Sequence, residues 1–169
     1  MQKVMSLHEI MTRSVYSVYP DTSITEAIRL LLNHHVSGAP VVEAHPCGDK
    51  LIGMLSEKDC LGVLTTGAYY DMPEYYVRDY MTKEVIKANP DMDLFAAADL
   101  FMKNNLRRLP IVDDKGYLIG IVTRRDVLNA SRSLWDRDIP AQDPGYLTEA
   151  VKAKLGRQGR VNLHKTQRF

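Results

Sequence analysis

The chain is poor in the features that mark secreted, membrane-bound or disulfide-stabilised proteins. It has only two cysteines among 169 residues, Cys47 and Cys60, and they do not form a Cys-x-x-Cys pair. Two isolated cysteines favour reduced thiols and a cytoplasmic location. The longest strongly apolar run, Leu118–Val122, is too short to cross a bilayer, and the N-terminal stretch lacks the apolar segment of a signal peptide. We therefore expect a cytoplasmic protein without membrane contact.

The chain also has little net charge, +1, but that charge is unevenly distributed. Six lysines and arginines and no acidic residue follow Glu149, which leaves residues 1–149 with a net charge of −5. A basic terminus can attract nucleic acid, yet no aromatic interleaving or nucleic-acid-binding motif accompanies this one. We therefore do not expect nucleic-acid binding. Contact with an acidic partner or simple solubilisation of the chain end both remain open.

What the chain does contain is an internal repeat. A shift of 70 residues places Met11-Thr12 on Met81-Thr82, and a shift of 67 places the octet GMLSEKDC, residues 53–60, on GIVTRRDV, residues 120–127. Proline, aspartate, alanine and leucine positions between these motifs also match. A repeat of this length indicates two similar structural units.

Each copy has the periodicity of a helix followed by two strands. Capping residues open the helices: Ser23 with Glu26 predicts a capping box, and Asp93 predicts an N-cap. Short apolar runs around turn residues predict strands at 39–42 and 51–55, and again at 109–112 and 117–122. A further helix begins at Ser56 or Thr123. The stripes predicted for the first helices are Ile24, Ala27, Ile28, Leu31 and Leu32, and Leu94, Ala97, Ala98, Phe101 and Met102.

The predicted order in each copy is strand–helix–strand–strand–helix, an α/β fold, or α+β in stricter usage. The expected organisation is a first repeat at 8–66, a tyrosine-rich linker at 67–78, a second repeat at 79–133 and a C-terminal extension with a basic tail at 134–169. We expect the tyrosine rings of the linker to cover apolar surface between or beside the repeats.

The octet permits two interpretations. Ser/Thr-x-x-Asp, where a strand turns into a helix, is a capping motif whose hydroxyl and carboxylate serve the first turn. The same geometry suits a ligand, because a helix N-terminus attracts anions and a glycine lets another group approach the backbone. The carboxylate can also accept hydrogen bonds from the two hydroxyls of a ribose. The octet alone favours capping over ligand binding.

Together these motifs resemble a tandem pair of CBS domains, also called a Bateman module, over about residues 8–133. The matching features are Met-Thr before the first strand, Pro-Asp before the first helix, a proline opening the second strand, and Gly-h-h-Ser/Thr-x-x-Asp after the third. The resemblance implies two repeats packed through their sheets and a regulatory adenine-nucleotide ligand, with AMP expected first and ADP, ATP or S-adenosylmethionine as alternatives. It implies no metal requirement. It also implies a homodimer formed through the repeat helices and an effector protein of unknown identity.

In that family each cleft is built from both repeats. The resemblance therefore assigns Thr123, Asp126, Thr12, Tyr16, Ser37, Gly38, Ala39 and Pro40 to one cleft. It assigns Ser56, Asp59, Thr82, Ile86, Arg107, Arg108, Leu109 and Pro110 to the other. The two aspartates would bind a ribose diol, and the hydroxyl residues would bind ribose or the first phosphate. The forked, charged heads of the two arginines suit phosphate, so we expect the second cleft to prefer more phosphate.

Other classes of function fit the sequence less well than a nucleotide-binding module. A ligand-free dimerisation platform is the main alternative, because some CBS pairs have lost ligand binding. An enzyme is not expected, since the two aspartates fall in different clefts and Cys60 matches the core position of Val127. The histidines and cysteine at His34, His35, His45 and Cys47 lack the spacing of zinc ligands.

Overall fold

The computed structural model describes residues 5–65 and 75–135. The basic segment after Glu149 and the linker residues Tyr69 and Tyr70 lie outside the described residues. In chain order the elements are α1 (Leu7–Ile10), α2 (Ile24–Asn33), β1 (Gly38–His45), β2 (Gly48–Ser56), α3 (Glu57–Thr65), α4 (Val77–Tyr80), α5 (Leu94–Lys103), β3 (Arg108–Val112), β4 (Leu118–Thr123) and α6 (Arg124–Trp135). Over the described ranges, no helix is both long and apolar enough to cross a membrane.

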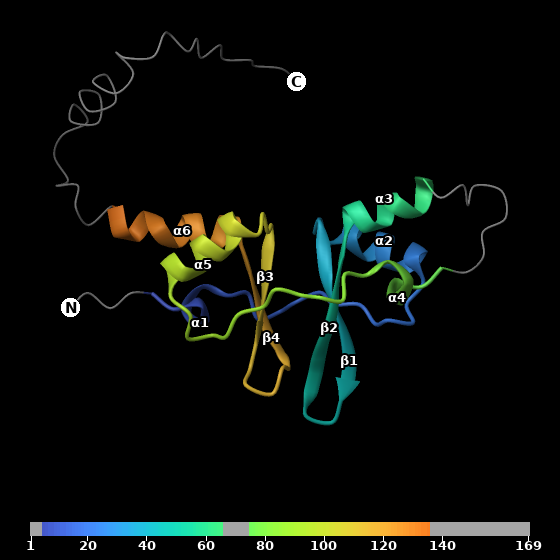
Figure 1. Cartoon of the computed structure of the whole chain (residues 1–169), viewed down its shortest axis with the longest axis horizontal. Helices are drawn as coiled ribbons and strands as arrows, with labels where there is room; N and C mark the ends of the chain where they lie inside the picture. The colour runs from blue at the N-terminus through green and yellow to red at the C-terminus, as the bar shows by residue number, and fades with distance from the viewer. Residues whose placement is uncertain (1–4, 66–74, 136–169) are drawn as a thin grey trace, which may run out of the picture. The chain divides into compact units, whose positions relative to one another are not determined.

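Two antiparallel hairpins, β1–β2 and β3–β4, lie beside each other in the middle of the repeat pair, with their tips pointing the same way (Figure 1). Each hairpin has a bulge at the matching position, between Val41 and Val42 and between Ile111 and Val112. The hairpins meet where the Leu51 amide donates to the Gly116 carbonyl at 3.2 Å. This arrangement confirms the predicted mixed helix and strand fold, with the two repeats packed through their sheets.

The prediction of a full strand at the start of each repeat is wrong. In its place a single residue, Val18 in one repeat and Ala88 in the other, forms a parallel bridge to the edge of its hairpin. The Val18 amide donates to the Pro40 carbonyl at 3.0 Å, and the Ala88 amide donates to the Pro110 carbonyl at the same distance. A proline cannot donate to a neighbouring strand, so the hairpin offers the passing segment few partners at this position.

The predicted helix caps are confirmed. The Ser23 hydroxyl accepts from the Glu26 amide at 3.2 Å, and the Asp93 carboxylate accepts from the Phe95 and Ala96 amides at 2.9 Å. The last residue of each predicted apolar stripe, however, is not in the core. Leu32 is 63% exposed and Met102 is 81% exposed. These residues lie about 80° around the helix from the first stripe residue, at the edge of the buried face.

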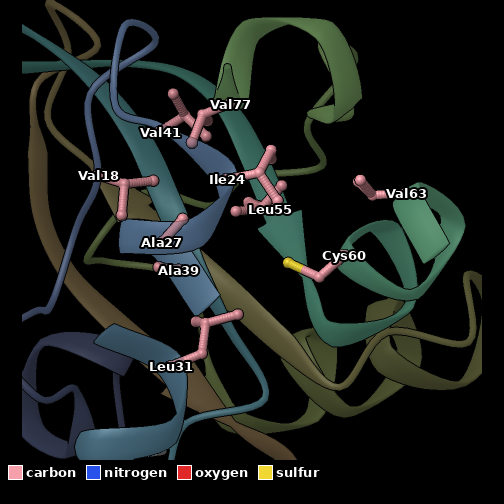
Figure 2. Close-up of a cluster of buried hydrophobic side chains, with 10 residues drawn as sticks. All are labelled: Val18, Ile24, Ala27, Leu31, Ala39, Val41, Leu55, Cys60, Val63 and Val77. Atoms are coloured by element: carbon pink, nitrogen blue, oxygen red, sulfur yellow. The ribbon is translucent and has the colours of Figure 1, made fainter. Parts of the chain in front are cut away.

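The core of the first repeat joins residues from both sides of the linker. Figure 2 shows Ile24, Ala27 and Leu31 of α2 facing Ala39, Val41 and Leu55 of the hairpin. Val77 of α4, which follows the linker, belongs to the same cluster. Tyr75 and Tyr80 pack against this cluster, so these two tyrosines cover apolar surface beside the first repeat as predicted.

The short helix that precedes each repeat in sequence packs against the other repeat (Figure 1). In α1, the Leu7 amide donates to the Met92 carbonyl at 2.9 Å, and the Leu94 amide donates to the Met5 carbonyl at 3.0 Å. In α4, the Val77 amide donates to the Thr22 carbonyl at 2.9 Å in the same manner. The spatial units therefore exchange their N-terminal segments, although the sequence repeat runs continuously.

The two Met-Thr motifs complete this exchange. Thr12 and Ile121 exchange both backbone hydrogen bonds at 2.9 Å, and Thr82 and Met54 do the same. The methionine before each threonine then lies on the glycine of the opposite octet. A Cβ atom at Gly120 would lie 2.6 Å from the Met11 sulfur and 3.2 Å from the Met11 Cβ. The octet glycine thus permits a close approach, and the approaching group is a methionine side chain.

Substituting Gly120 with alanine should therefore destabilise the protein. The added methyl group overlaps the first atoms of the buried Met11 side chain, which have little room to move. We expect Gly120→Ala to lower the free energy of unfolding by about 1–3 kcal/mol in urea titrations. Gly62→Ala is the control, because a Cβ at Gly62 meets no atom within 4 Å and alanine favours the helix. Equal stability of the two variants would contradict this packing.

The two cysteines should differ sharply in reactivity. Cys47 is exposed at the tip of the β1–β2 hairpin, whereas Cys60 is 6% exposed. Burial and the neighbouring Asp59 carboxylate raise the pKa of the Cys60 thiol, which keeps it protonated at neutral pH. We expect one fast and one slow reaction with a thiol-labelling reagent in the native protein, and Cys47→Ser should abolish the fast one. Fast labelling that survives Cys47→Ser would show that Cys60 is accessible.

Candidate functional site

Both octets form a reciprocal cap at the junction of a strand and a helix. The Asp59 Oδ2 atom accepts from the Ser56 hydroxyl at 2.6 Å and from the Ser56 amide at 2.8 Å. The Asp126 Oδ2 atom accepts from the Thr123 hydroxyl at 2.7 Å and from the Thr123 amide at 2.8 Å. The capping interpretation is therefore confirmed for both copies. It leaves Oδ1 of each carboxylate without a hydrogen-bond partner among the described residues, so capping and ligand contact are compatible.

Two cavities open beside these caps, and each is lined by residues of both repeats. The first, which we call the Thr123 cleft, has a volume of about 580 Å³. Of the eight residues predicted for it, five line it: Thr12, Tyr16, Ser37, Gly38 and Thr123. Ala39 and Pro40 are fully buried, and the half-buried Asp126 is bonded to Thr123 at the edge of the cleft.

The second cavity, the Asp59 cleft, has a volume of about 710 Å³. Seven of its eight predicted residues line it: Ser56, Asp59, Thr82, Ile86, Arg107, Arg108 and Pro110. Leu109 does not line it, and its side chain is fully buried.

The two clefts differ in the groups they offer. Tyr16 lines the Thr123 cleft and stacks on His34, with ring centroids 3.7 Å apart and planes 16° apart. The matching positions in the second repeat are Ile86 and Asn104, which line the Asp59 cleft. The Asp59 cleft instead contains the cations Arg107 and Lys58 together with the carboxylates of Asp59 and Glu84. One cleft therefore offers an aromatic surface where the other offers ionised side chains of both signs.

Arg108 lies between the clefts and lines both of them. Its guanidinium donates to the Gly38 carbonyl and, at 2.6 Å, to the Ser37 hydroxyl. Burial lowers the pKa of Arg108, the Glu57 carboxylate opposes this shift, and the Arg107 guanidinium adds to it. An arginine keeps its charge under such shifts. The sequence-based assignment of Arg108 to the Asp59 cleft alone is therefore too narrow.

Arg124 directly follows the octet hydroxyl Thr123, but its side chain is held at the end of α5. Its guanidinium donates to the Leu106 carbonyl and, at 2.9 Å, to the Asn105 side-chain oxygen. Both acceptors lie just beyond the C-terminus of α5, where Asn105 has a positive φ of 50°. A cation there compensates the free carbonyls of the helix end. Arg124 lines neither cleft.

Sequence reasoning missed Glu57 and the asparagines Asn104 and Asn105. Glu57 lines both clefts, and its amide donates to the Ser37 carbonyl at 3.1 Å. Glu57 could have been identified from its place directly after the octet hydroxyl, at the first position of α3.

Within the described ranges, no group of three His, Cys, Asp or Glu side chains is arranged to hold a metal ion.

Relatives of this chain include proteins with and without a known activity. An uncharacterized protein of Methanocaldococcus jannaschii is 35% identical, with 76% of this chain and 92% of that protein covered. The inosine-5'-monophosphate dehydrogenase of the same organism is 36% identical over 75% of this chain. The match covers only 24% of that enzyme's length, so it spans a part of a larger protein.

Solved structures with the same fold carry adenosine compounds. CBSX2 from Arabidopsis thaliana in complex with AMP has a TM-score of 0.66 and 31% identity, covering 76% of this chain and 97% of that one. The CBS domain pair of protein MJ0100, in complex with 5'-methylthioadenosine and S-adenosyl-L-methionine, has a TM-score of 0.66 and 25% identity, covering 77% and 98%. The sequence profile of the CBS domain matches residues 7–66 and 77–133. The chain therefore belongs to the CBS domain family and carries two of these domains in tandem.

Proposed function

We propose that this chain is a regulatory module that binds an adenine nucleotide in at least one of its two clefts and transmits the ligand state to a partner protein. The observation that carries the proposal is the composition of the clefts. Each joins the Ser/Thr-x-x-Asp cap of one repeat to the Met-Thr segment of the other. A ligand that contacts both sides is sensitive to the relative position of the repeats, which is how binding can shift a conformational equilibrium.

The proposed contacts follow from the hydrogen-bond acceptors that the caps leave unused. The unpaired Oδ1 atoms of Asp59 and Asp126 accept hydrogen bonds from a ribose diol. The hydroxyls of Ser56 and Thr123 lie next to these carboxylates and contact ribose or the first phosphate. Apolar side chains at the cleft walls, such as Val15 and Ile121, hold adenine. Binding at the helix N-termini adds an attraction for negative charge.

AMP is the first candidate ligand, because the solved CBSX2 structure holds AMP and is 31% identical to this chain. The Asp59 cleft contains Arg107 and Lys58, two cations that the Thr123 cleft lacks, so we also propose that it prefers ligands with more phosphate, such as ADP or ATP. S-adenosylmethionine is the alternative ligand, and it suits the Thr123 cleft, where Tyr16 provides an aromatic surface for a cation.

A ligand-free interaction platform is the second candidate function. The observation that favours it is that capping alone accounts for both hydroxyls and both carboxylates of the octets. Catalysis is not proposed. The relatives with a named activity match this chain over only about a quarter of their own length. Two free thiols, one of them exposed, fit a cytoplasmic location.

We also propose a homodimer formed through the repeat helices. Each helix pair carries large apolar side chains exposed to solvent: Leu32 and Leu61 on α2 and α3, and Phe95, Met102 and Leu128 on α5 and α6. Exposed apolar side chains on neighbouring helices are typical of protein interfaces. The effector protein is a separate partner, and it binds this module differently when the ligand is present.

Removing either octet aspartate should affect both stability and ligand binding. We expect Asp59→Ala and Asp126→Ala each to lower the free energy of unfolding by about 1 kcal/mol, because each removes a helix cap. In calorimetric titrations with AMP, ADP, ATP and S-adenosylmethionine, each should also weaken binding in its own cleft. The loss of a charged acceptor costs about 1.5–3 kcal/mol, which corresponds to about tenfold to a hundredfold in Kd.

Asp93→Ala is the matched control for this experiment. Asp93 also caps a helix, since its carboxylate accepts from two amides in the first turn of α5, but it lines neither cleft. The Asp93→Ala variant should lose a similar free energy of unfolding, and its affinity for each of the four ligands should equal that of the wild type. If well-folded wild-type protein shows neither heat nor a thermal shift with any of the four ligands, the nucleotide-sensor proposal is wrong and the interaction platform takes its place.

The dimer proposal makes a separate prediction. Leu61 and Leu128 occupy matching positions on α3 and α6 and are 59% and 64% exposed. We expect the double variant Leu61→Glu, Leu128→Glu to sediment as a monomer at concentrations where the wild type is a dimer, because a dimer interface would bury two carboxylates. Glu43→Gln, an exposed change on the β1–β2 hairpin, should leave the dimer intact. A wild-type chain that sediments only as a monomer would contradict the proposal.

A further inference from the structure

The two clefts share a wall made of four residues. Ser37, Gly38, Glu57 and Arg108 line both cavities. Gly38 and Arg108 occupy matching positions in the two repeats, so the shared wall contains one long cationic side chain and no counterpart to it. The difference is built into the backbone. A Cβ atom at Gly38 would lie 2.7 Å from the Leu55 carbonyl oxygen, so this position has no room for a side chain.

The guanidinium of Arg108 is hydrogen-bonded to the Ser37-Gly38 segment of this wall. It donates to the Gly38 carbonyl and to the Ser37 hydroxyl, the latter at 2.6 Å. These two acceptors are uncharged polar groups that line the Thr123 cleft as well as the Asp59 cleft, and they are suitable partners for the donors of a nucleoside. While Arg108 holds them, a nucleoside in the Thr123 cleft must bind without them or displace the guanidinium.

A phosphate group in the Asp59 cleft would compete for the same guanidinium. An anionic phosphate adds a Coulomb attraction for the guanidinium that the neutral Ser37 and Gly38 oxygens do not supply, and partial burial strengthens this attraction. Arg108 is half-buried and already borders the Asp59 cleft. The side chain therefore has a stronger acceptor within reach whenever a phosphate occupies that cleft.

We propose that Arg108 is a switch residue shared by the two clefts: a phosphate-bearing ligand in the Asp59 cleft draws its guanidinium away from Ser37 and Gly38, and this raises the affinity of the Thr123 cleft for a phosphate-free adenosine compound. The inference rests on the proposed nucleotide-binding function and adds to it a direction of coupling and a ligand class for each cleft. Coupling between binding sites is reciprocal, so the nucleoside raises the affinity for the phosphate ligand by the same factor.

The charges around the Thr123 cleft support the preference for a phosphate-free ligand. Glu57 and Arg108 are its only lining residues with a permanent charge, among the described residues. When the guanidinium moves toward the Asp59 cleft, Glu57 is left as the dominant charge of the Thr123 cleft, whereas in the Asp59 cleft it is accompanied by Arg107 and Lys58. A carboxylate repels a second phosphate and favours a neutral or cationic ligand. The two clefts thus become selective for different members of the adenosine class.

The test is a calorimetric titration of adenosine into the full chain, with and without ATP at a concentration that fills one site. In the wild type we expect ATP to lower the Kd for adenosine by about fivefold or more, the lower range of typical coupling between sites. In Arg108→Met, which keeps the length of the side chain but has no donor, adenosine alone should bind as tightly as it binds wild type in the presence of ATP. Added ATP should then have no further effect.

Arg107→Gln is the matched control, because Arg107 is the neighbouring cation and lines only the Asp59 cleft. It should weaken ATP binding but keep the full coupling once ATP is saturating. Ser37→Ala is a second variant that leaves Arg108 in place and removes the 2.6 Å hydrogen bond together with one acceptor for the nucleoside, so the adenosine affinity can fall while the coupling should be reduced about twofold or more. Circular dichroism and thermal melts confirm that each variant is folded.

The outcomes separate this inference from the function on which it rests. If neither ligand binds the wild type, the nucleotide-sensor proposal fails and the switch fails with it. If both ligands bind but ATP leaves the adenosine affinity unchanged or lowers it, the sensor proposal stands and the switch is wrong. Coupling that persists in Arg108→Met would also overturn the inference, because it would have to pass through other residues.

Discussion

The exchange of N-terminal segments between the two repeats is the contact on which the rest of the structure depends. Thr12 pairs with Ile121 and Thr82 pairs with Met54, and each methionine beside these threonines packs on the octet glycine of the other repeat. Without this exchange the caps of one repeat would face solvent. With it, each cap lies beside the Met-Thr segment of the other repeat, and a cavity remains between the two.

The two octets show how one motif can serve stability and binding together. In each octet the hydroxyl accepts from the aspartate amide in the first turn, and one carboxylate oxygen accepts from the amide and hydroxyl of Ser56 or Thr123. The second oxygen is left for another partner. Capping a helix requires only short-range geometry, whereas binding requires that the capped end lie at a cavity wall. The octet therefore keeps its structural role in a repeat whose cleft has lost its ligand.

The pseudo-symmetry of the repeats makes their differences informative. Tyr16 stacked on His34 has Ile86 and Asn104 as its counterpart, and Gly38 has Arg108. These exchanges place an aromatic surface in the Thr123 cleft and a single cationic side chain, Arg108, between the two clefts. Because Arg108 lines both clefts and contacts Ser37 across the shared wall, this cation connects them. Two equal clefts would lack such a link.

Much of this protein was predictable from short-range sequence patterns. The repeat, the capped helices at Ser23 and Asp93, the two hairpins and the Ser/Thr-x-x-Asp motifs depend on residues a few positions apart, and all of them are present in the structure. The resemblance to CBS pairs, read from several such motifs in order, also identified the family. Local hydrogen bonds and apolar periodicity decide these features before any tertiary contact forms.

Only the tertiary structure decided the features that depend on distant residues. The predicted first strands are reduced to single bridges at Val18 and Ala88, because the neighbouring hairpin edge there contains a proline. Leu32 and Met102 continue an apolar stripe in sequence but lie beyond the area that the hairpins cover. Arg108 belongs to both clefts because its side chain crosses to a segment 70 residues away. Sequence determined which local elements form, whereas packing decided which surfaces they cover and which long side chains cross between them.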